Sequence, residues 1–189
     1  MAKKVVALAG GIGSGKSTAG RFCAQKGFKV VDCDEISREV AQKKEVLDGI
    51  ARVFGERFVE QGQLNRRALA EEVFCDAQKT EKLNGIFHEE ILRDLKAQID
   101  REQGVVFVEI PLLEEKFLHL FDEIWLFIAD KQNIINRVST RDNRSHQQIE
   151  DILRRQKKYG TLQKSVVIAN DGTLQELYDK LENMLGQVV

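Results

Sequence analysis

The sequence of 189 residues has little proline, no long apolar segment and no excess of charge of either sign. Its single proline, Pro111, rules out a proline-rich linker, and no low-complexity tract or internal repeat interrupts the chain. No apolar run approaches the length of a membrane helix, so we expect no membrane partner. The 29 lysine and arginine residues are balanced by 30 aspartate and glutamate residues, which argues against nucleic acid as the main partner.

Cysteine and histidine are also scarce, and neither shows the spacing of a disulfide framework or a zinc site. The cysteines are Cys23, Cys33 and Cys75, and the histidines are His88, His119 and His146. An odd number of scattered cysteines is typical of reduced thiols, and no signal peptide is visible before the first apolar run. We therefore expect a cytoplasmic protein, a monomer or weak homo-oligomer, with one well-buried α/β domain.

The most informative stretch is the glycine-rich segment Gly10–Ser17, which matches the pattern G-x-x-x-x-G-K-[ST] without a mismatch. The apolar run Val5–Ala9 before it predicts a buried parallel strand. The segment Ser17–Gln25 after it predicts a helix that ends at Lys26-Gly27. A strand, a glycine loop and a helix form the setting of a phosphate-binding loop, or Walker A motif.

Chemistry explains the residue types in this loop. Glycine lacks a Cβ atom, so the backbone can curl and direct several N–H groups at an anion near the positive end of the following helix. Lys16 would reach the β- and γ-phosphates of ATP, and the Ser17 hydroxyl would bind Mg²⁺. The predicted nucleotide-binding residues here are Gly11, Ile12, Gly13, Ser14, Gly15, Lys16, Ser17 and Thr18. A glycine-rich turn that binds nothing remains the alternative, whereas the dinucleotide-binding pattern fails at Lys16.

Four further apolar segments predict strands and, with the first, a five-stranded, mostly parallel sheet with flanking helices. They are Phe28–Val31, Val105–Glu109, Glu123–Ile128 and Val166–Ile168. Asp32 and Asp34 follow the second strand, and ligands bind at the carboxyl ends of strands in such sheets. Either Glu109 or Asp130, which follow later strands, could assist Mg²⁺.

Two segments are expected to lie outside the nucleotide-binding core of residues 1–34, 105–136 and 161–189. Residues 35–104 contain no good strand candidate and predict a helical substrate lobe, with a turn at Gly62–Arg66 and Asn65 as a helix N-cap. Residues 137–160 predict a lid that closes over the transferring phosphate and excludes water. Its cations are Arg137, Arg141 and Arg144. Capping boxes are predicted at Ser145 with Gln148 and at Thr173 with Glu176.

Phosphate loops occur in small-molecule kinases, in switch GTPases and in ATPases that drive motion or binding. The N-K-x-D motif of GTPases and the L-S-G-G-Q signature of transporter ATPases are both absent from the sequence. An arginine-bearing lid and an aspartate at a strand end supply the cations and the carboxylate that phosphoryl transfer needs. The sequence therefore favours a small-molecule kinase.

Beyond the loop, the chain resembles the dephospho-coenzyme A kinase family nearly from end to end. The segments that carry the resemblance are Val31–Asp34, Phe54-Gly55, Gly62–Arg66 with Leu69, Val73-Phe74, Ile110–Glu115, Arg137, Arg141-Asp142, Arg155-Gln156 and Asn170. The resemblance implies a transferase that uses MgATP to phosphorylate the ribose 3′-hydroxyl of dephospho-coenzyme A, the last step of coenzyme A biosynthesis.

The resemblance also implies roles for single residues. Asp34 matches the proposed general base, Asp32 would support Mg²⁺ or the substrate, and Arg137 and Arg141 match the lid cations that join Lys16 in catalysis. Asn170 would contribute to the nucleotide site, and the substrate-binding residues would be Asp32, Arg66, His88, Pro111 and Leu112. The sequence departs from the family pattern at His88-Glu89 for the usual His-Pro, at Lys164-Ser165 for the usual Ala-Asp, and at Cys33 between the two aspartates.

Simpler interpretations stay open beside these roles. Asp34 could be the N-cap of a helix that starts near Ile36, and the lid arginines could be solvated surface cations. Arg66 could cap its own turn, and His88 could be an ordinary helix histidine. For the whole chain, the alternatives are another nucleotide- or nucleoside-like kinase and a regulatory ATP-binding module without transfer activity.

Overall fold

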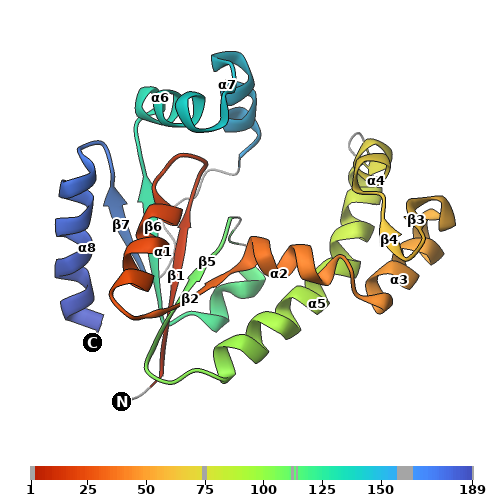
Figure 1. The fold of residues 1–189 in the computed structure, drawn as a ribbon, viewed down its shortest axis with the longest axis horizontal. Coiled ribbons are helices and arrows are strands. Elements are labelled where there is room, and N and C mark those ends of the chain that lie inside the picture. Colours follow the sequence, from red (N-terminus) through yellow and green to blue (C-terminus); the bar gives the residue numbers. More distant parts are fainter. Residues whose placement is uncertain (1–2, 74–75, 112, 114, 157–163, 189) are drawn as a thin grey trace. The chain divides into compact units, whose positions relative to one another are not determined.

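The computed structural model describes residues 3–73, 76–111, 113, 115–156 and 164–188. The chain divides into two compact units (Figure 1). We call Met1–Asp32 together with Ile99–Val189 the sheet unit, and Cys33–Gln98 the helical unit. No helix in the described part of the chain combines the length and the apolar character that crossing a membrane requires.

The sheet unit contains a five-stranded parallel sheet with strand order β2-β5-β1-β6-β7. Its strands are β1 (Lys4–Gly10), β2 (Lys29–Asp32), β5 (Val105–Glu109), β6 (Glu123–Ile128) and β7 (Ser165–Ala169). The predicted sheet is confirmed, since all five predicted apolar segments form strands that pair in parallel. The residues of β1 after Lys4 are all buried, so the glycine loop that follows leaves the centre of the sheet.

Helices cover one face of this sheet and stand beyond its carboxyl edge. Helix α1 (Lys16–Gln25) and helix α8 (Leu174–Val188) bury Phe22, Leu177 and Leu181 against Phe107 and Trp125 of the strands. Figure 1 shows α6 (Lys131–Asp142) and α7 (His146–Arg155) beyond the strand ends, near the loop that joins β1 to α1. A short 3₁₀ helix, η2, spans Glu115–Leu120.

The helices begin where their caps predict. Ser145 and Gln148 form both hydrogen bonds of a capping box at the start of α7. Thr173 and Glu176 exchange the same pair of hydrogen bonds before α8, with lengths of 2.7 and 3.2 Å. Both predicted capping boxes are therefore confirmed.

The helical unit contains α2 (Cys33–Val40), α3 (Lys44–Phe54), the 3₁₀ helix η1 (Glu56–Phe58), α4 (Arg66–Val73) and most of α5 (Ala77–Asp100). Asn65 caps α4 as predicted, since its Oδ1 accepts a 3.1 Å hydrogen bond from the Ala68 N–H. The expectation of a segment without strands was wrong. Strands β3 (Val59–Glu60) and β4 (Gln63–Leu64) form a small antiparallel hairpin, so the predicted turn at Gly62–Arg66 is partly strand.

Candidate active site

The side chain of Asn170, the residue directly after β7, is bonded to the backbone of the phosphate-binding loop. The Asn170 Nδ2 donates a 2.8 Å hydrogen bond to the Ser14 carbonyl, and the residue is only 7% exposed. Gly15 has φ 109°, and a Cβ atom there would lie 2.3 Å from the same amide nitrogen. Only glycine fits this close approach, so Asn170 and Gly15 together fix the curvature of the loop.

The other side of the loop contacts α6 and α7. The Ile12 N–H donates to Oε1 of Gln156, the residue after α7, at 3.2 Å. The Ile12 side chain packs against a small apolar cluster formed by Ile134, Ile135, Val138 and Ile149. The Ser14 hydroxyl is buried and has no hydrogen-bond partner among the described residues. The loop directly precedes α1, and the N-terminus of a helix is a site that favours an anion.

Lys16 and Ser17 are the first two residues of α1. Within the part of the chain that the structure describes, the Lys16 ammonium has neither an ion-pair nor a hydrogen-bond partner, so it is available to an anionic ligand. The Ser17 hydroxyl donates a hydrogen bond to Oε1 of Glu109, the last residue of β5. In the sheet register Glu109 pairs with Leu8 of β1 and with Asp32 of β2, so both carboxylates lie at one edge of the sheet.

These donors fit Mg²⁺. This ion keeps several waters and is held through one or two carboxylates together with substrate phosphates, so it needs no cage of protein ligands. Among the described residues, no group of three or more histidine, cysteine, aspartate or glutamate side chains could hold a metal ion by itself. The hydroxyl of Ser17 and the carboxylates of Glu109 and Asp32 are suitable oxygen ligands. Glu109 fits better than Asp130, because Glu109 accepts the hydrogen bond from Ser17, whereas Asp130 is exposed at the start of α6.

All three predicted lid arginines have partners in this structure, and Arg144 forms an ion pair of 3.8 Å with Asp142. Arg137 donates to the carbonyl oxygens of Asn170 at 2.8 Å and of Gly172 at 3.4 Å, in the turn after β7. Arg141 makes two hydrogen bonds to the Asp142 carboxylate, at 2.6 and 2.9 Å. This hydrogen bonding raises the pKa of Arg141 and lowers the pKa of Asp142. Each guanidinium keeps further N–H donors beyond those that these hydrogen bonds use.

Asp34 is the second residue of α2 and is exposed. Since α2 begins at Cys33, Asp34 lies within the first helical turn, and the alternative that it caps a helix starting near Ile36 was wrong. Asp32 ends β2 in the sheet unit, whereas Asp34 belongs to the helical unit. Pro111 is exposed two residues after β5, and the predicted substrate residue Leu112 lies outside the described residues.

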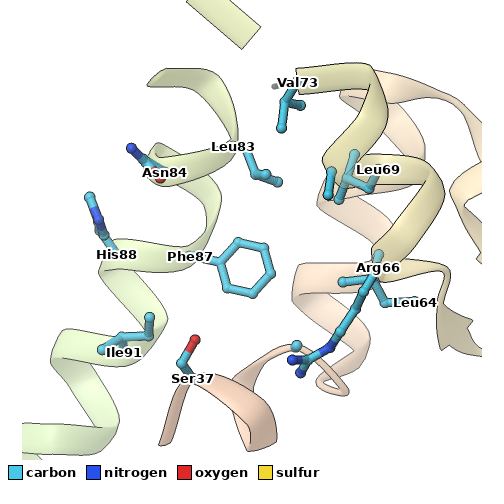
Figure 2. A pocket seen from close by; sticks show the side chains of 12 residues that line it. Ser37, Leu64, Arg66, Leu69, Val73, Leu83, Asn84, Phe87, His88 and Ile91 are labelled. Carbon is cyan, nitrogen blue, oxygen red and sulfur yellow. The ribbon is translucent and has the colours of Figure 1, made fainter. Parts of the chain in front are cut away.

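The helical unit contains a pocket of about 390 Å³ that brings together two predicted substrate residues, Arg66 and His88. Figure 2 shows them on facing helices, α4 and α5, with the Phe87 ring between. The Arg66 guanidinium is oriented by a 3.3 Å hydrogen bond to the Arg38 carbonyl. The pocket has an apolar part and a polar part, and its other lining residues include Ser37, Leu69, Val73, Leu83, Asn84 and Ile91.

Comparison with known proteins identifies the family. The family model described as dephospho-CoA kinase matches residues 4–176. The dephospho-CoA kinase of Fusobacterium nucleatum is 35% identical, over 96% of this chain and 97% of the relative. That of Acinetobacter baylyi is 37% identical, over 94% of both chains. The chain belongs to the dephospho-CoA kinase family.

Solved structures agree with the fold of this kinase family. A crystal structure of a protein from Thermus thermophilus has a TM-score of 0.82 and 29% identity, and the match covers 100% of both chains. The dephospho-CoA kinase from Campylobacter jejuni has a TM-score of 0.64 and 21% identity, with 98% of this chain and 97% of that chain covered. The predicted family, fold class and kinase activity are confirmed, and a kinase with this loop uses ATP.

The three departures from the family pattern have different structural settings. His88 lines the pocket of the helical unit, so the change after it, to Glu89, lies beside a candidate substrate site. Lys164 lies in the turn that leads into β7, with φ 61°, and its ammonium donates to the Phe121 carbonyl at 3.4 Å. Cys33 is buried at the start of α2, which leaves Asp32 and Asp34 on either side of it as the polar groups.

Proposed function

We propose that the protein transfers the γ-phosphoryl group of MgATP to the ribose 3′-hydroxyl of dephospho-CoA, giving CoA and ADP. The observation that carries the proposal is the loop itself, in a chain of this family. Asn170 fixes the loop by a hydrogen bond to the Ser14 carbonyl. The Lys16 ammonium is unpaired among the described residues, and the Ser17 hydroxyl donates a hydrogen bond to Glu109 at the end of β5.

The sheet unit would bind the phosphates. The loop N–H groups and Lys16 would hold the β- and γ-phosphates, as backbone donors and an ammonium do at helix N-termini. Ser17, Glu109 and Asp32 would hold Mg²⁺ at the carboxyl edge of the sheet, directly or through water. When bound, the ion would offset negative charge on the phosphate oxygens and so favour attack by an oxygen nucleophile.

In the transfer step, Asp34 would accept the proton of the ribose 3′-hydroxyl. The hydroxyl oxygen then forms a bond to the γ-phosphorus, while the bond between that phosphorus and the β,γ-bridging oxygen breaks and ADP leaves. Arg137 and Arg141 would neutralise the charge in transfer, through the guanidinium N–H donors that their present partners at Asn170, Gly172 and Asp142 do not use.

The helical unit would bind the acceptor. Its pocket offers Arg66 for an anionic group, His88 and Asn84 as hydrogen-bonding groups, and an apolar wall that includes Phe87. Dephospho-CoA carries a diphosphate, a nucleoside and a long arm in which amide groups alternate with short apolar segments. A pocket with both polar and apolar lining residues therefore suits a part of it.

ADP release from MgATP, measured with and without dephospho-CoA, tests the reaction. Wild type should show a rate that depends on the acceptor. Lys16→Ala should lose on the order of 10²–10³ of that rate because a phosphate-binding cation is removed. Asp34→Asn should lose roughly 10²–10⁴ of it because a general base is removed, while MgATP binding is kept.

Two results would redirect the assignment. A slow ADP release that ignores dephospho-CoA and is unchanged by Asp34→Asn would point to a regulatory ATP-binding module. A faster rate with other nucleosides or nucleotides as acceptors would point to a different small-molecule kinase on the same fold.

A further inference from the structure

We propose that Gln156 is a ligand of the nucleotide phosphates: its side-chain nitrogen donates to a phosphate oxygen while its side-chain oxygen stays on the Ile12 N–H. The inference rests on the proposed function, because it deepens the description of the MgATP site. It adds a side chain that lies 144 residues along the chain from the loop residue it contacts.

The orientation of the Gln156 carboxamide follows from its partner. The Ile12 N–H is a donor, so the group that faces it at 3.2 Å must be the carboxamide oxygen rather than the nitrogen. The same oxygen would lie 2.8 Å from a Cβ atom at Gly11, so the side chain rests directly on the loop and glycine makes room for it. The nitrogen carries two N–H donors, and no acceptor within hydrogen-bond distance of it lies among the described residues.

The backbone of Gln156 is also fixed. Its N–H donates to the Ile152 carbonyl at 2.9 Å and closes the last turn of α7. Helix α7 in turn packs through Ile149 against the cluster of α6 that contacts the Ile12 side chain. Gln156 is therefore fixed at two points: its backbone is bonded to α7, and its side-chain oxygen is bonded to the loop at Ile12.

This arrangement extends the anion site of the loop. The Gln156 carboxamide accepts the Ile12 N–H and has two N–H donors of its own. The loop therefore loses one backbone donor to this contact and gains two side-chain donors. Phosphate oxygens are acceptors only, and hydrogen bonds to charged groups are stronger than those between neutral groups. A nucleotide would thus gain a contact without the loss of the contact between Gln156 and Ile12.

Two substitutions separate this role from the other roles that Gln156 could have. Gln156→Met has a similar length but no donor and only a weak acceptor, so the Kd for MgATP should rise about tenfold. Gln156→Glu keeps an acceptor for the Ile12 N–H but replaces the two donors with a negative charge. It should keep the melting temperature of the nucleotide-free protein and still raise the Kd for MgATP about a hundredfold. Titration calorimetry on the full chain, with melting curves, measures both quantities.

Matched controls and a second readout complete the test. Gln147 is an exposed residue of α7, and its side chain donates to Asp151 at 3.3 Å. Gln147→Glu and Gln147→Met should leave the Kd for MgATP within about twofold, as surface changes away from the site do. In steady-state assays, the KM for MgATP should rise in the Gln156 variants while the KM for dephospho-CoA stays unchanged.

The outcomes distinguish this inference from the proposed function. If wild type binds MgATP and releases ADP in response to dephospho-CoA, but Gln156→Met binds MgATP equally well, Gln156 is only structural and the inference is wrong. If Gln156→Met binds MgATP more tightly, the side chain blocks the site and the inference is again wrong. If wild type itself fails to bind MgATP, both the proposed function and the inference fall.

Discussion

The two units of this kinase present binding surfaces of opposite kinds. In the sheet unit, the candidate phosphate site consists of backbone N–H groups, whose positions are set by Asn170 and Gln156 from outside the loop. In the helical unit, the pocket is lined by side chains, with Arg66 and His88 as its most polar members. Backbone recognition depends on chain geometry, whereas side-chain recognition depends on which residues are present.

This difference assigns different tolerances to the two sites. The loop can change few residues, because its glycines meet neighbouring atoms or adopt positive φ angles that other residues avoid. The exposed polar side chains of the pocket, such as Arg66, can be altered one at a time, so we expect acceptor preference to be easier to change than nucleotide binding. Substitutions made in matched pairs can test this contrast.

The largest difference is expected between two Gly→Ala substitutions, one in each unit. Gly15→Ala should lower the acceptor-dependent ADP release on the order of 10²–10³, because φ 109° and the Asn170 contact both exclude a Cβ atom and a small displacement of the loop misplaces the phosphates. Gly85→Ala, in an open part of α5, should keep full activity and raise stability by about 0.5–1 kcal/mol. Steady-state kinetics and thermal melting measure the pair. If the two variants had equal activity, phosphoryl transfer would not depend on the geometry of the loop at Gly15.

A smaller effect, on the metal, is expected at the carboxyl edge of the sheet. Glu109→Gln should shift the Mg²⁺ concentration needed for half-maximal activity upward by about ten- to a hundredfold, because Glu109 is joined to the Ser17 hydroxyl. Asp130→Asn is the matched control and should leave the Mg²⁺ titration unchanged, since Asp130 lies at the exposed start of α6. Chelation of Mg²⁺ should stop both enzymes. The reverse pattern, with Asp130→Asn sensitive and Glu109→Gln normal, would move the metal site to the other carboxylate.

Local patterns predicted the sheet unit well because each of its parts depends on neighbours in sequence. The apolar runs that became β5 and β6 have the predicted bounds, and the loop pattern needs only eight consecutive residues. The contacts that hold the loop could not be predicted in this way. Ile12 and Gln156 are 144 residues apart, and Ser14 and Asn170 are 156 residues apart, so only the folded chain brings them together.

The helical unit was predicted less well for a related reason. The strands of its hairpin have two residues each, too few to show an alternating pattern, and only the turn glycine, Gly62, gives a signal. Arg66 and His88 came from the family resemblance, whereas their meeting at one pocket depends on how α4 and α5 pack. Side chains that form a site by helix packing leave no pattern in a single sequence.

The smallest effect is expected in the pocket, where neighbouring arginines form a matched pair. Arg66→Met should raise the KM for dephospho-CoA about tenfold with little change in the KM for MgATP, because a cation that lines the pocket is removed while the apolar stem is kept. Arg67→Met removes an exposed arginine that pairs with Glu71 at 3.1 Å, and it should leave both KM values unchanged. If Arg66→Met instead raised the KM for MgATP, the pocket would serve the nucleotide. If neither KM moved, the acceptor would bind elsewhere, and the division between backbone recognition of phosphate and side-chain recognition of the acceptor would not hold for this enzyme.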